Sequence, residues 1–204
     1  VAVGANALKA NTTADNNTAV GRNALQANTT GEYNTAVGAL SSDSITTGSL
    51  NTAIGYYTLQ AATTAANNTA LGAQALAVTT SGANNTAVGM NALVANTTGT
   101  ENNALGANAG DSITTGSNNI AIGNLALAGE TTGNKSVAIG RRALLAQNFT
   151  GGEDSNNTAV GFEAGNDITT GVKNTLIGSL AGDGMTTGGN NTAVGYESLS
   201  AVCT

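Results

Sequence analysis

The chain has 204 residues, of which 40% are hydrophobic, 3% aromatic and 9% charged, and its net charge at pH 7 is −6. Only six residues are basic, so we expect no nucleic-acid partner and no binding to an anionic membrane surface. There is no histidine and one cysteine, which leaves no disulfide framework and no metal-ligand set of Cys and His. No apolar run approaches the ~20 residues of a membrane span.

A short motif, Asn-Thr-Ala-Val-Gly in its commonest form, returns along the whole chain. A fixed period marks a repeat architecture in which each unit buries its apolar face only against its neighbours. We therefore expect one domain over residues 1–204, cut from a longer array, with an all-β fold: a parallel β-solenoid of twelve coils. The closing glycine recurs every 17 residues, with one spacing of 21, at Gly4, Gly21, Gly38, Gly55, Gly72, Gly89, Gly106, Gly123, Gly140, Gly161, Gly178 and Gly195.

The period is unbroken from Val1 to Leu145, and the register then gains four residues between 146 and 155. The stretch Asn148-Phe149-Thr150-Gly151 looks like a shifted Asn-Thr-Thr-Gly, which the other units carry before their next motif. This pattern predicts a bulging loop at one corner of the coil. Regular repeats resume after it and continue to Thr204.

Within the motif, successive side chains of a strand point to opposite faces. Thr86 and Val88 share one face, and two units place aliphatic residues, Ile120 and Val137, where Thr86 stands. We expect this face to form the interior. The glycine that follows allows a corner at positive φ, and Thr-Thr-Gly predicts a second corner.

The opposite face of the strand carries alanine in almost every unit. A column kept small and apolar predicts close approach of another backbone. It lines either an inter-chain contact around a three-fold axis or a tight strand within one chain. The candidates for the inter-chain contact are Ala36, Ala53, Ala70, Ala87, Ala104, Ala121 and Ala138.

Bulk is exchanged between two positions of the unit. Most units have Leu four residues after the key glycine, as at Leu93, whereas four units have Gly or Ser there and a large residue three positions later, as at Gly110 and Ile113. Exchanges that conserve volume are the ones a close-packed interior tolerates. We expect the two positions to fill one cavity.

Stacked coils lie ~4.8 Å apart, so equivalent side chains form columns, and side-chain amides in such a column can hydrogen-bond as a ladder. A second column holds the first threonine of each Thr-Thr-Gly, as at Thr97. The predicted structural ladder consists of Asn17, Asn34, Asn51, Asn68, Asn85, Asn102, Asn119, Asn157, Asn174 and Asn191.

The motif resembles a known family of repeats. Ser136-Val137-Ala138-Ile139-Gly140 is similar to the head repeats of trimeric autotransporter adhesins, and Asn51-Thr52-Ala53-Ile54-Gly55 looks like longer repeats of phage-type tail fibres. The resemblance covers nearly the whole chain. It implies a left-handed β-roll, a homotrimer, and a location outside the cell, on the cell surface or on a virion surface.

No residues stand out as catalytic, and we expect no enzyme activity, no metal and no cofactor. The acidic residues are scattered over turns, and only Gly151-Gly152-Glu153-Asp154 hints at a calcium-type loop. Asn148 lies in a sequon within the predicted loop, so it is the candidate site for a glycan. Cys203 replaces the first threonine of the corner in the last unit. It is interpreted as a small buried filler, and the alternative is an intermolecular disulfide.

The leading hypothesis is a structural segment of an extracellular fibre or adhesin that associates with itself, as a homotrimer or as an end-to-end filament. The rival is an ice-binding solenoid that uses its Thr columns. Attachment to a host surface or a glycan ligand is a third class of function, which the sequence does not test.

Overall fold

The protein folds as a stack of twelve short parallel strands. The computed structural model describes residues 1–200, and each strand forms at the Thr-Ala-Val part of the repeat, where β-branched residues favour extended backbone. Residues 17 apart pair in the sheet, as Thr69 does with Thr86. The strands pair in sequence order: β1 (Ala2–Val3), β2 (Thr18–Val20), β3 (Thr35–Val37), β4 (Thr52–Ile54), β5 (Thr69–Leu71), β6 (Thr86–Val88), β7 (Asn103–Leu105), β8 (Ile120–Ile122), β9 (Val137–Ile139), β10 (Thr158–Val160), β11 (Thr175–Ile177) and β12 (Thr192–Val194).

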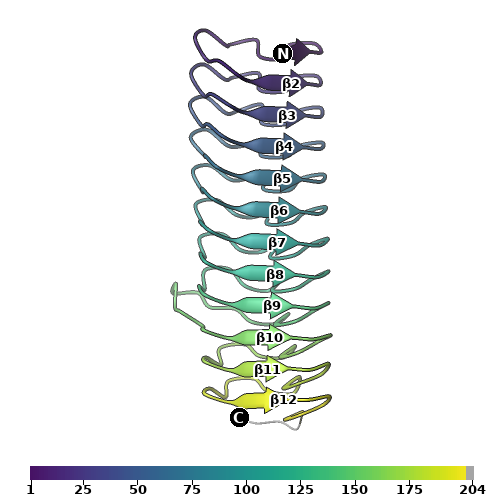
Figure 1. Ribbon diagram of the computed structural model, residues 1–204. Coiled ribbons are helices and arrows are strands. Elements are labelled where there is room, and N and C mark those ends of the chain that lie inside the picture. Colours follow the sequence, from purple (N-terminus) through teal and green to yellow (C-terminus); the bar gives the residue numbers. More distant parts are fainter. Residues whose placement is uncertain (201–204) are drawn as a thin grey trace.

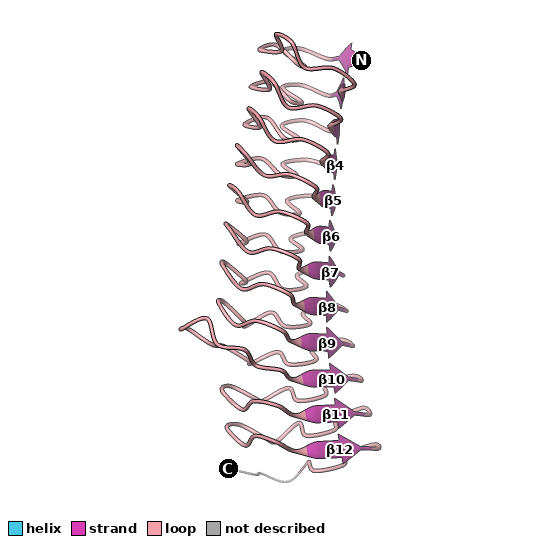
Figure 2. Ribbon diagram, turned by 60° about the vertical axis from the view of Figure 1, so that its left-hand side comes forward, coloured by secondary structure: helices cyan, strands magenta, loops and turns pink. Residues whose placement is uncertain are grey.

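The stack forms a rod with β1 at one end and β12 at the other (Figure 1). The strands run from left to right at the front of Figure 1, and the chain returns behind them one coil lower, so the coils wind in a left-handed sense. Figure 2 shows that the sheet forms one side of the rod and that turns and loops form the rest. The prediction of an all-β parallel solenoid is confirmed, and residues 1–200 contain no helix.

The alanine column lines the interior of the rod. In β6, Ala87 is fully buried, whereas Thr86 and Val88 on the other face of the strand are partly exposed. The predicted alternation is present, but the prediction that Thr86 and Val88 face inward is wrong. The reason is the narrow coil, in which the residue facing inward meets the opposite wall and a methyl group already fills the space.

The one large residue in this column, Leu176, supports the same account. It fits because Gly165 and Gly182 stand where most coils have Leu. A Cβ added to Gly165 would lie 2.9 Å from a Leu176 methyl group, and one added to Gly182 would lie 2.8 Å from the other methyl. The inward-facing strand residue and the corner residue therefore share one limited volume.

The same burial corrects the proposed inter-chain contact. Seven alanines were its candidates, and each is at most 2% exposed within its own chain. Side chains closed off in this way contact their own core and leave no surface for a second chain. The structure therefore shows the alternative reading, a tight strand within one chain, for Ala36, Ala53, Ala70, Ala87, Ala104, Ala121 and Ala138.

The exchange of bulk between two corner positions is also visible. A Cβ added to Gly110 would lie 3.0 Å from the Cδ1 of Ile113 and 3.1 Å from a methyl group of Leu93 in the preceding coil, so Ile113 fills the space beside Gly110. Where Leu is kept after β2, β4, β5, β6, β8 and β9, a buried small or polar residue stands at the Ile113 position instead. These residues are Asn28, Ala62, Thr79, Asn96, Glu130 and Gln147.

The corner after each strand needs backbone conformations that favour glycine. Gly89 has φ 137°, and a Cβ there would collide with the carbonyl of Gly106 in the next coil. Leu93 adopts φ 51° at the same corner, a left-handed conformation that costs roughly 1–2 kcal/mol for a residue with a side chain. Its burial in the core offsets this cost.

The spacing of 21 residues appears between β9 and β10 as a loop that projects from the rod (Figures 1 and 2). Along the chain, the loop lies between the corner and the start of β10, and it points away from the sheet. An isolated parallel bridge between Asn134 and Asp154 fixes its returning arm to the coil above. The four extra residues thus lie outside the stack, and the coils on either side keep their register.

Candidate interaction surfaces

The outer face of the sheet is the most regular surface of the rod. Its aliphatic column is unbroken, and several members are well exposed, such as Leu71 at 44% and Leu105 at 51%. Beside it runs a column of threonine, interrupted only at Asn103, Ile120 and Val137 in β2–β12. The aliphatic column consists of Val3, Val20, Val37, Ile54, Leu71, Val88, Leu105, Ile122, Ile139, Val160, Ile177 and Val194.

The asparagines predicted to form a ladder lie in one column at the start of the strands. Asn85 is representative: its Nδ2 donates to the carbonyl of Gly99 at 2.9 Å, and its Oδ1 accepts the N–H of Asn102 at 2.9 Å. Asn17, Asn34, Asn51, Asn68, Asn102 and Asn119 bond in the same way, as do Asn157 and Asn174. Asn191 donates its N–H to Asn174 Oδ1 at 3.0 Å. These amides, which are buried except at Asn191, stabilise the stack and offer no binding site.

Two threonine columns follow the Thr-Thr-Gly corner, and their environments differ. The hydroxyl of Thr97 donates to the carbonyl of Thr114 at 3.0 Å, and the equivalent threonines repeat this bond from coil to coil. The second threonine of each pair points outward and is mostly exposed, as Thr98 is. Of these two corner columns, only the second is therefore free to order water.

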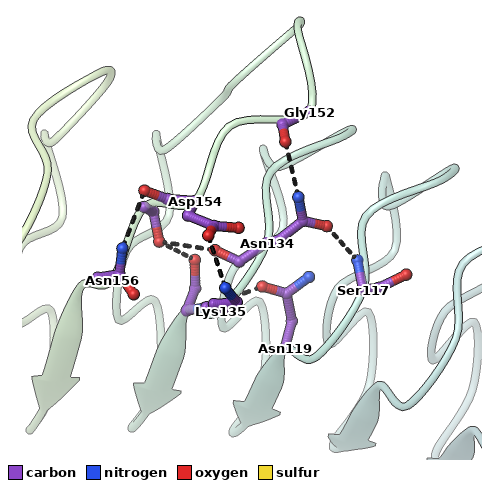
Figure 3. A network of polar contacts seen from close by, with 9 residues as sticks. Ser117, Asn119, Asn134, Lys135, Gly152, Asp154 and Asn156 are labelled. Atoms are coloured by element: carbon purple, nitrogen blue, oxygen red, sulfur yellow. Dashed lines mark hydrogen bonds and ion pairs between the residues drawn. The ribbon is translucent and has the colours of Figure 1, made fainter.

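The projecting loop is held at its base by polar contacts (Figure 3). Asn134 donates its side-chain N–H to the carbonyl of Gly152 at 2.7 Å, and its Oδ1 accepts the N–H of Ser117 in the preceding coil at 2.8 Å. Lys135 and Asp154 form an exposed ion pair at 2.6 Å. Such exposed pairs contribute about 0–1 kcal/mol, so the backbone and amide contacts fix the loop.

A buried polar cluster lies beneath this loop, and the sequence reasoning missed it. The carboxylate of Glu130 accepts the N–H groups of Thr131, Gly133 and Phe149 at 2.7–3.1 Å. The amide of Gln147 donates to Glu130 Oε2 at 2.8 Å and to the hydroxyl of Ser136 at 2.7 Å.

This cluster replaces the ladder where the register changes. Ser136 stands in the asparagine column and pairs with Ser155 at 2.6 Å. The signal in the sequence was the coincidence of a charged residue in the interior column and a serine in the ladder column beside the insertion. The function of the cluster is to satisfy the backbone groups that the insertion displaces.

Asn148, the candidate glycan site, is exposed at the start of the loop. Its Oδ1 accepts the Thr131 hydroxyl at 2.7 Å, and Phe149 beside it is buried at 5% exposure. The side chain is accessible, but modification stays a prediction. Cys203 lies outside the described residues.

Charged groups gather around the same coils. Arg142 contacts Glu163 at 2.7 Å, and Arg141 lies over the ring of Phe162 with 5.5 Å to its centroid. Elsewhere, burial at the corner raises the pKa of Asp43 and of Asp111 above the ordinary value. Neither carboxyl faces a second titratable group that would make an acid-base pair.

Residues 1–200 bring no three His, Cys, Asp or Glu side chains together in a group that could hold a metal ion. No pocket opens in this described part of the chain. It also contains no helix long and apolar enough to cross a membrane.

No family model matches the chain, and no curated protein or solved structure matches it either. The fold itself defines the class: a parallel β-solenoid repeat protein with coils of 17 residues. The adhesin-like and tail-fibre-like character of the motif stays a resemblance.

Proposed function

We propose that the chain is a structural segment of an extracellular or virion-surface fibre or adhesin, and that it associates with itself through the outer face of its sheet. The supporting observation is the unbroken aliphatic column on that face, where a solvated strand would carry polar variety. The proposal requires no catalysis and no cofactor. The proposed contact surface is therefore the outer face of the strands, opposite the alanine column for which the sequence predicted the contact.

The outer sheet face is long and narrow. Eleven coil steps of ~4.8 Å and strands of three residues at ~3.3 Å give a footprint of roughly 520 Å². Stable interfaces bury about 800 Å² on each partner, so we expect the contact to include residues that flank the strands. A partner that covers the whole column must also repeat every ~4.8 Å, which a second copy of the same solenoid does.

The resemblance favours a homotrimer around an axis parallel to the rod, and end-to-end stacking into filaments is a compatible second mode of assembly. A host-surface or glycan ligand would then bind faces that the assembly leaves free. The acidic, weakly charged surface supports neither nucleic-acid binding nor membrane insertion.

The experiment places charge on the outer sheet face. Leu71→Arg with Leu105→Arg should reduce the mass measured by light scattering to that of one chain, because two desolvated cations would face the partner. The circular dichroism of the strands should not change, since both side chains point out of the coil. The matched control, Thr64→Arg with Thr98→Arg, places the same charges on the exposed corner and should leave the mass unchanged. An equal mass before and after the sheet-face substitutions would refute the proposal.

Ice binding is the second candidate, favoured by one observation. The exposed second threonines of the corner, including Thr30, Thr47, Thr64 and Thr98, form a column with the coil spacing of ~4.8 Å. Thermal hysteresis of the purified chain tests this directly. Its absence at millimolar concentration removes the candidate.

A further inference from the structure

One stretch of the outer sheet face differs from the rest. Within β2–β12, each strand presents one aliphatic and one polar residue outward, except β8 and β9, where both are aliphatic. We call Ile120, Ile122, Val137 and Ile139 the apolar block. These side chains are partly exposed, with Ile122 at 36%, and they add nothing to the core.

A periodic face creates a problem for self-association. If two identical rods slide past each other by one coil, they lose contact at only one of twelve coils, and every other coil meets an equivalent one. Register is weakly specified when successive positions are alike. Some feature of the face that does not repeat has to select one alignment.

The apolar block is such a feature. When copies related by rotation about an axis parallel to the rod lie in register, the block of one copy meets the block of the next. A slip of one coil places block residues against Asn103 or Thr158 instead, so an apolar side chain faces a polar one. An antiparallel pair can join its blocks only about a two-fold axis between β8 and β9, which leaves the aliphatic residues of β1–β4 uncovered.

We propose that the apolar block is a register key that aligns copies of this chain parallel and in register. The inference rests on the proposed self-association through the outer sheet face. It goes beyond it because it assigns the alignment to four residues.

The test measures the axial offset between two copies. In a Cys203→Ser background, one copy carries a nitroxide at Thr47→Cys and the other carries a gadolinium label at Thr170→Cys. Both sites are exposed at the corner, away from the sheet face. They lie seven coils apart, so the axial separation is ~34 Å in register and changes by ~4.8 Å for each coil of slip. Pulsed dipolar spectroscopy between the two label types reads this distance.

The variant that removes the block is Ile120→Thr with Val137→Thr. Threonine stands at this position in eight other strands, so the coil should fold normally, which circular dichroism checks. The unsubstituted block should give one narrow distance, and the variant should give several distances separated by ~4.8 Å at unchanged mass. Adding Thr52→Ile and Thr69→Val rebuilds the block in β4 and β5 and should restore one narrow distance.

Each other result has a distinct meaning. One narrow distance in both proteins overturns the register key but leaves self-association standing. Several distances with the block intact also overturn the key. No distance between the two label types with the block intact shows that the copies do not associate, which overturns the proposed function as well.

Discussion

At the scale of single residues, the fold depends on side chains that substitute for water. The corner before each strand leaves a backbone carbonyl and an N–H that the sheet does not pair, and the coil closes around them. The amide of Asn85 satisfies both, with the carbonyl of Gly99 and the N–H of Asn102. An unpaired buried group costs about 1–3 kcal/mol, so the ladder is a condition for stacking.

Asn85→Leu should therefore lower the free energy of unfolding by roughly 2–6 kcal/mol, because it leaves two buried backbone groups unpaired. Asn91→Leu is the matched control. Leu40, Leu125 and Leu180 already occupy its position in other coils with the same left-handed backbone, at φ 59°. Denaturant unfolding followed by circular dichroism compares the two, and equal losses would show that the ladder amides are replaceable.

At the scale of the coil, the interior is a shared volume that neighbouring coils divide between them. Polar residues at the interior position bond to the next coil when it offers a donor, as Gln147 does for Glu130. Asn96 has no such partner, because Ile113 follows it in the next coil, and its buried Oδ1 stays unpaired. The Oδ1 atom of Asn28 is left unpaired in the same way above Ile45.

This arrangement predicts a rescue. Leu93→Gly should open a cavity that costs about 2–5 kcal/mol. Adding Asn96→Ile should recover part of that loss, since it copies the Gly110 and Ile113 arrangement and removes an unpaired acceptor. Thermal unfolding of the single and double variants measures the recovery. A double variant no more stable than Leu93→Gly would mean that the two positions fill separate spaces.

Much of the coil could be predicted from the sequence, because the residue types allowed at each position can be compared across many equivalent repeats. The strand, the asparagine column and the exchange between Leu93 and Ile113 positions all follow from comparing equivalent residues. The direction in which the strand faces did not follow, because threonine and valine on one side and alanine on the other are both compatible with burial. The volume available inside the coil decides which face of the strand is buried. In the sequence, Leu176 with Gly165 and Gly182 at the neighbouring corner positions was the one indication of how small that volume is.

The cluster beneath the loop shows a different limit. The buried carboxylate of Glu130 accepts two N–H groups from its own corner, and a third comes from Phe149, 19 residues away. That N–H is oriented by an insertion with no repeat to compare. Contacts that occur once, between residues brought together by an irregular loop, carry no periodic signal.

At the scale of the whole molecule, the rod is a one-dimensional array in which each coil contacts only its two neighbours. The coils of β1 and β12 have one neighbour each, and their outward residues are more exposed, with Val3 at 56% and Val194 at 67%. Such arrays open from their ends rather than all at once.

Native-state hydrogen exchange should therefore show a gradient along the rod. We expect amides of β6 and β7 to exchange most slowly, and amides of β1 and β12 to exchange fastest, with intermediate values between them. Mass spectrometry of proteolytic fragments after exchange measures the profile. Uniform protection from end to end would indicate a single cooperative unit.

The ladder bonds also have a direction. In nine coils the asparagine Nδ2 reaches the carbonyl 14 residues ahead, and Oδ1 receives an N–H from the coil that follows, while the corner threonines also donate forward. The two ends of such a rod are chemically different. The C-terminal end presents asparagine and threonine side chains whose hydrogen-bond partners would lie in a further coil, and the N-terminal end presents backbone groups that can bond to such side chains. During synthesis from the N-terminus, every finished coil is a template whose polar groups are satisfied only when the next coil arrives. The stack therefore grows in one direction, as a polar filament does.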